Sequence, residues 1–71
     1  MAQLSEQAQT RLAVAALTAA LVKTIGERDK SFSSLFMKEL DRHYRNMEDY
    51  DTHPTGAMET LRWTKELIQS K

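Results

Sequence analysis

The sequence predicts an all-α protein, a compact antiparallel bundle of three helices that associates with another chain through its first helix. Strong helix formers such as Ala, Leu, Glu and Lys are abundant, whereas the 71-residue chain holds two glycines and one proline. Apolar residues recur every three or four positions over three segments. Two polar stretches, ERDKS and EDYDTHPTG, interrupt this recurrence and separate the helices.

The first helix is expected over residues 5–25. Ser5 is a suitable N-cap residue, Glu6 follows it in the first turn, and Gly26 supplies a stop. The run LAVAALTAALV, Leu12 to Val22, contains no charged residue and a single hydroxyl, so this helix is apolar on all sides. One face is bulky and the other is formed mainly by alanines. The bulky face consists of Val14, Leu17, Leu21 and Ile25.

The alanine face of this helix is predicted to bind a second chain. A helix that is apolar all round is normally buried all round, and the two remaining helices of so short a chain can cover only one side of it. Small side chains let two helix backbones approach closely, which suits a homodimer. Alternatively, the alanines are exposed and reflect helix propensity alone. The candidate self-association residues are Ala8, Leu12, Ala15, Ala16 and Ala19.

The second helix is expected over residues 31–48, with Asp29 or Ser31 as its N-cap. Its core side is marked by apolar residues at helical spacing, and a basic stripe lies opposite. That stripe is either a solvated outer face or a docking strip for an acidic partner. The predicted core residues are Phe32, Phe36, Leu40, His43, Tyr44 and Met47. The basic stripe consists of Lys38, Arg42 and Arg45.

The third helix is expected over residues 55–69, with Thr52 or Thr55 as its N-cap, after a loop that contains Pro54. Trp63 falls away from the apolar stripe, so its ring either bends over the edge of the core or belongs to an intermolecular contact. Residues 1–71 show no repeat and no second domain. The apolar stripe consists of Ala57, Leu61, Thr64 and Ile68, with Leu67 at its border.

Charge balance and composition limit the classes of function. Ten basic and ten acidic side chains cancel, which disfavours a protein that neutralises nucleic-acid phosphates. The absence of cysteine excludes Cys-based zinc sites and thiol nucleophiles. The apolar run is shorter than the roughly 20 residues of a membrane span, and Glu6, Arg11 and Lys23 around it do not suit a secretory leader. We therefore expect a cytoplasmic protein without a membrane segment.

Residues that could carry catalysis or bind metal are few. The cluster EDYDTH does not match the calcium-loop pattern, because Pro54 or Arg62 would occupy required positions. Glu39 and His43 have the spacing of a carboxylate that orients an imidazole, but we expect His43 in the core. No Gly-x-Ser-x-Gly elbow or phosphate-binding glycine loop is present. The prediction is a protein that is not an enzyme and needs no cofactor or metal.

The predicted function is that of a noncatalytic protein-protein interaction or regulatory module that forms a homodimer. The alternative is a small helix-turn-helix-like regulator associated with nucleic acid, with Arg62 and Lys65 on its reading helix. Glu59 and Glu66 share that surface and would repel phosphates. The candidate residues for binding another protein are Lys38, Arg42, Arg45, Met58, Trp63 and Leu67.

Overall fold

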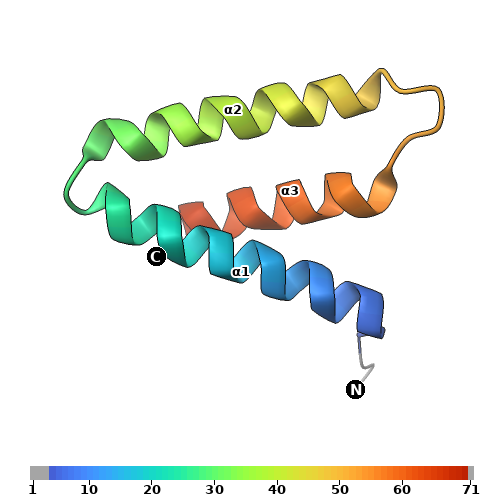
Figure 1. The fold of residues 1–71 in the computed structure, drawn as a ribbon, viewed down its shortest axis with the longest axis horizontal. Coiled ribbons are helices and arrows are strands. Elements are labelled where there is room, and N and C mark those ends of the chain that lie inside the picture. Colours follow the sequence, from blue (N-terminus) through green and yellow to red (C-terminus); the bar gives the residue numbers. More distant parts are fainter. Residues whose placement is uncertain (1–3, 71) are drawn as a thin grey trace.

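The computed structural model describes residues 4–70, which form three α-helices (Figure 1). These helices are α1 (Glu6–Gly26), α2 (Lys30–Glu48) and α3 (Thr55–Gln69). α2 runs back along α1, and α3 reverses direction again and lies between them (Figure 1). The predicted all-α antiparallel three-helix bundle is confirmed, and each predicted helix boundary agrees to within one residue.

Polar side chains begin the first two helices. The Ser5 hydroxyl accepts a hydrogen bond from the Ala8 N–H at 3.1 Å, as an N-cap residue does. Asp29, rather than Ser31, caps α2, since its carboxylate accepts from the Ser31 N–H at 3.1 Å and from the Ser31 hydroxyl at 2.6 Å. Each cap accepts a hydrogen bond from a backbone N–H group of the first turn, which has no partner within the helix itself.

The start of α3 and the end of α1 differ from the prediction in detail. Pro54 is the N-cap of α3, and no side chain caps this end, because a proline side chain has no hydrogen-bond acceptor. Thr55 is the first residue of the helix, and its N–H donates to the His53 carbonyl at 2.8 Å. α1 does end at Gly26, but without a positive φ. Gly26 instead allows a close approach, since a Cβ there would collide with the Ser33 hydroxyl of α2.

The bundle is flattened. Its Cα atoms extend over 36 × 34 × 14 Å, and their radius of gyration is 13.1 Å, about 2 Å above the value expected for a spherical chain of this length. α1 packs mainly on α3. The small core therefore lies chiefly between these two helices. The buried residues are Ala15, Ala19, Val22, Gly26, Leu40 and Thr64.

The two faces of α1 are arranged opposite to the prediction. The inner face, formed by Ala15, Ala19 and Val22, is buried within the chain's own core, with Ala15 0 % and Ala19 2 % exposed. The outer face, formed by Val14, Leu17 and Leu21, is exposed by 48 %, 74 % and 61 %. Ala15 and Ala19 are thus unavailable to a second chain, because they are already buried in the core of their own chain. Of the other candidate self-association residues, Ala8 is half-buried, and Leu12 and Ala16 are exposed.

The core side of α2 is largely as predicted, with one exception. Leu40 is buried, and the rings of Phe32 and Phe36 stack with their centroids 6.2 Å apart. The prediction that His43 lies in the core is wrong. Its side chain is 56 % exposed, and its Nε2 lies 3.8 Å from the Glu39 carboxylate at the edge of the helix.

The core side of α3 follows the predicted stripe except at its start. Thr64 is buried, and its hydroxyl donates to the Thr60 carbonyl at 2.7 Å, so it brings no unpaired polar group into the core. Leu61 and Ile68 are half-buried. Ala57 is exposed, because it lies in the first turn of α3.

Candidate interaction surface

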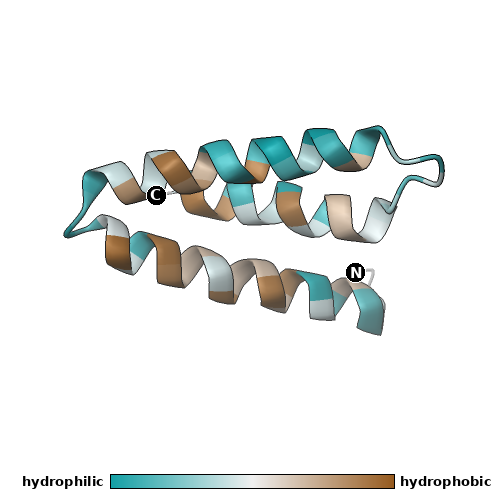
Figure 2. Ribbon diagram, turned by 45° about the horizontal axis from the view of Figure 1, so that its top comes forward, coloured by the Kyte–Doolittle hydropathy of each residue, from teal (hydrophilic) through white to brown (hydrophobic). Residues whose placement is uncertain are grey.

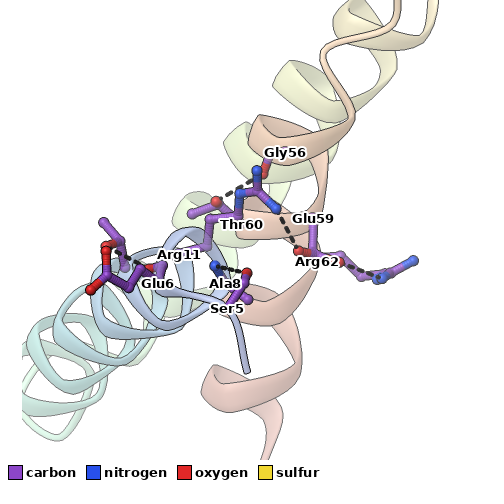
Figure 3. A network of polar contacts seen from close by, with 9 residues as sticks. Ser5, Glu6, Ala8, Arg11, Gly56, Glu59, Thr60 and Arg62 are labelled. Atoms are coloured by element: carbon purple, nitrogen blue, oxygen red, sulfur yellow. Dashed lines mark hydrogen bonds and ion pairs between the residues drawn. The ribbon is translucent and has the colours of Figure 1, made fainter. Parts of the chain in front are cut away.

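Arg11 joins α1 to the beginning of α3. Its guanidinium extends from α1 across to α3 and lies 3.2 Å from the Glu59 carboxylate (Figure 3). Gly56 leaves room for this crossing, because a Cβ there would come within 2.7 Å of the Arg11 Nη2 atom. The Glu59 carboxylate also lies 3.9 Å from Arg62 of its own helix. The charge of Arg11 is therefore directed toward α3.

Lys23 joins α1 to the end of α3. Its ammonium donates to the Ser70 carbonyl at 2.8 Å and to the Leu67 carbonyl at 3.3 Å. The last carbonyls of a helix have no partners within the helix and carry partial negative charge, so a lysine there is favourable. Arg11 and Lys23, which bound the apolar run of α1, thus both pair with α3.

Because Arg11 and Lys23 both pair with α3, the outer face formed by Val14, Leu17 and Leu21 carries no charge. No charged residue occurs between Arg11 and Lys23. The hydroxyls of Thr10 and Thr24, toward the two ends, donate to the Glu6 and Ala20 carbonyls of their own helix at 3.0 and 2.7 Å. Hydrophobic residues recur along α1, whereas much of α2 is hydrophilic (Figure 2). Contiguous exposed apolar surface of this kind marks interaction sites in soluble proteins.

Sequence reasoning assigned the outer face to the core, although one signal pointed the other way. On a helical wheel, Arg11 and Lys23 flank the alanines rather than the leucines. Packing the alanines inward lets both basic side chains reach α3, whereas packing the leucines inward would direct them away. This signal is hard to recognise in the sequence, because Glu59, the partner of Arg11, lies 48 residues further along the chain.

The predicted basic stripe of α2 is exposed but partly neutralised. The Arg42 guanidinium lies 2.6 Å from the Glu39 carboxylate, and this hydrogen bond, with the charge of Arg42 and a smaller effect of His43, lowers the pKa of Glu39. The Arg45 Nε–H donates to the Asp41 carbonyl at 3.3 Å. Lys38 is exposed on the same helix. A pair of exposed charges contributes little binding energy by itself.

The three predicted partner-binding residues of α3 do not form an exposed cluster. Met58, Trp63 and Leu67 are each half-buried. For Trp63 this burial agrees with a ring at the edge of the core. These residues therefore offer less accessible apolar surface than the outer face of α1.

The basic side chains of the predicted nucleic-acid-reading helix lie beside carboxylates. Lys65 contacts Asp41 at 3.0 Å, and Arg62 lies 3.9 Å from Glu59. Phosphate binding would have to compete with these acidic groups.

Within residues 4–70, no group of three His, Cys, Asp or Glu side chains could hold a metal ion, and no helix is long and apolar enough to cross a membrane. A cleft of about 120 Å³ lies between α2 and α3 and is lined by Leu40, Tyr44 and Leu61 among others.

Fold and surface together define the class, a small all-α three-helix protein with one uncharged, exposed helix face. Comparison with models of protein families, with curated proteins and with solved structures finds no match to this chain.

Proposed function

We propose that this protein is a noncatalytic protein-protein interaction module that forms a homodimer through the outer face of α1, and that it acts in the cytoplasm. The observation that carries the proposal is the exposure of Leu17, at 74 %, in the middle of an uncharged helix face. Burial of a leucine side chain is worth about 1.5–3 kcal/mol. A partner that covers this face therefore gains most of its binding energy there.

The large solvent-accessible area of the chain supports an interface with a second copy. Its solvent-accessible area is 5602 Å². A compact monomer of 8.2 kDa is expected to expose about 4,500 Å². The excess of roughly 1,000 Å² is comparable to the ~800 Å² that each protein contributes to an interface of standard size.

Sedimentation of matched variants tests the proposal. The double substitution Leu17→Glu and Leu21→Glu places charge on the outer face, and Leu35→Glu changes a leucine of α2 that is 60 % exposed and lies outside it. We expect the mass of the wild type and of Leu35→Glu to rise from monomer to dimer between micromolar and millimolar concentration. The double variant should remain a monomer with unchanged helical content.

Two results would reject the proposed function. One is a wild-type chain that remains a monomer at millimolar concentration. The other is a double variant that dimerises as strongly as Leu35→Glu.

A further inference from the structure

We propose that the second copy packs on the outer face of α1 in an antiparallel orientation, with the two-fold axis close to Leu17, so that Glu6 of each copy meets Arg28 of the other. The inference rests on the proposed function and specifies the geometry of its interface. An interface formed by the same patch on both subunits is the usual arrangement of two-fold dimers. The surface must then be complementary to itself in charge.

The charged residues Glu6 and Arg28 supply this match. Glu6 and Arg28 lie at equal distances from Leu17, eleven residues before it and eleven after it. Eleven residues is close to three helical turns, so Glu6 lies on about the same side of α1 as Leu17, and Arg28 follows two residues after the end of the helix at Gly26. Both are exposed, and neither forms an ion pair with another residue of the described range 4–70. An antiparallel second copy turns these ends toward each other and forms the Glu6–Arg28 pair twice.

A parallel second copy would lack this match, because it would bring Glu6 to Glu6 and Arg28 to Arg28. Like charges at both ends disfavour association. The two helix dipoles would also align in parallel, with equal partial charges side by side.

Disulfide formation distinguishes the two orientations, because the chain contains no cysteine of its own. Thr10 and Thr24 lie seven residues before and after Leu17, and both are exposed. We expect Thr10→Cys alone and Thr24→Cys alone to remain uncrosslinked under mild oxidation. An equimolar mixture of the two should form a linked dimer that contains one chain of each kind, since a disulfide requires Cα atoms within about 7 Å. Leu35→Cys, away from the outer face, is the uncrosslinked control.

Each outcome is read together with the mass in solution. Wild-type dimers whose Thr10→Cys or Thr24→Cys variants each crosslink with themselves would be parallel, which overturns the orientation and leaves the proposed function intact. Wild-type dimers whose mixture forms no mixed disulfide would overturn the alignment on Leu17. A wild type that sediments as a monomer would overturn the proposed function together with this inference.

Discussion

Asp29 shows how one exposed side chain contributes to the fold. It lies where the chain turns from α1 into α2, and its carboxylate accepts hydrogen bonds from the Ser31 hydroxyl and N–H. The hydrogen bond from the Ser31 hydroxyl is the largest cause of a lowered pKa at Asp29, and backbone donors add to it. The ionised form of this residue therefore stabilises the start of α2.

The lowered pKa predicts a pH dependence of stability. Because the pKa of Asp29 is lower in the folded than in the unfolded chain, its contribution is complete above about pH 4 and is lost as the pH falls through the folded value. Asp29→Asn retains a good N-cap that does not titrate. We expect the melting temperature of the wild type, followed by circular dichroism, to fall further than that of Asp29→Asn between about pH 5 and pH 2. Parallel curves for the two proteins would contradict this role.

The packing of α1 on α3 depends on the small size of the inner face. Ala15 and Ala19 are almost fully buried, so the two helices approach as closely as alanine permits. Arg11 and Lys23 then reach α3 on either side of this contact. Larger side chains on the inner face would separate the helices and lengthen both polar contacts.

This arrangement predicts that two alanines of α1 differ in how much a larger side chain lowers the stability of the protein. Ala19→Leu adds volume to a closed contact, and we expect it to lower the free energy of unfolding by about 1–3 kcal/mol. Ala16→Leu changes an exposed residue of the same helix, and its effect should stay within about 0.5 kcal/mol. Urea denaturation of both variants measures the difference. Equal effects, or a larger effect at Ala16, would show that the inner face, which contains Ala19, is not the packed one.

The flattened shape makes the single chain a small domain with little core. Its buried apolar side chains are Ala15, Ala19, Val22 and Leu40, within a layer 14 Å deep. Chains of this length bury only about 60 % of the surface that they expose when unfolded, and their stability is marginal. A homodimer would add the outer face of α1 to the buried surface, so folding and association would be coupled.

Coupling of this kind predicts that stability depends on concentration. Binding that is specific to the folded state raises the melting temperature as the partner concentration increases. Over a hundredfold range of protein concentration we expect the wild-type melting temperature to rise by about 5–10 °C. The variant with Leu17→Glu and Leu21→Glu should melt at one temperature throughout, and Leu35→Glu should follow the wild type. Scanning calorimetry or circular dichroism at several concentrations measures this, and a wild-type melting temperature without such a trend would argue against the dimer.

Local patterns in the sequence were sufficient for the three helices and for the cap of the first, and they narrowed the cap of the second to Asp29 or Ser31. Periodicity of apolar residues placed α1, α2 and α3 correctly, because such periodicity reflects the geometry of the helix itself. Ser5 and Asp29 act on N–H groups within three residues of themselves, so their role is visible in the neighbouring sequence. His43 was misplaced because its position at the edge of the apolar stripe is compatible with either the core or the surface.

Which side of α1 faces inward was decided only by tertiary structure. An all-apolar helix has no polar face to direct its packing, so the local pattern left the leucine and alanine faces as competing choices. The choice depends on the fit of Ala15 and Ala19 to α3 and on the contacts of Arg11 with Glu59 and of Lys23 with the carbonyls of Leu67 and Ser70. These partners lie more than forty positions away along the chain, and only the folded arrangement of α1 and α3 brings them together.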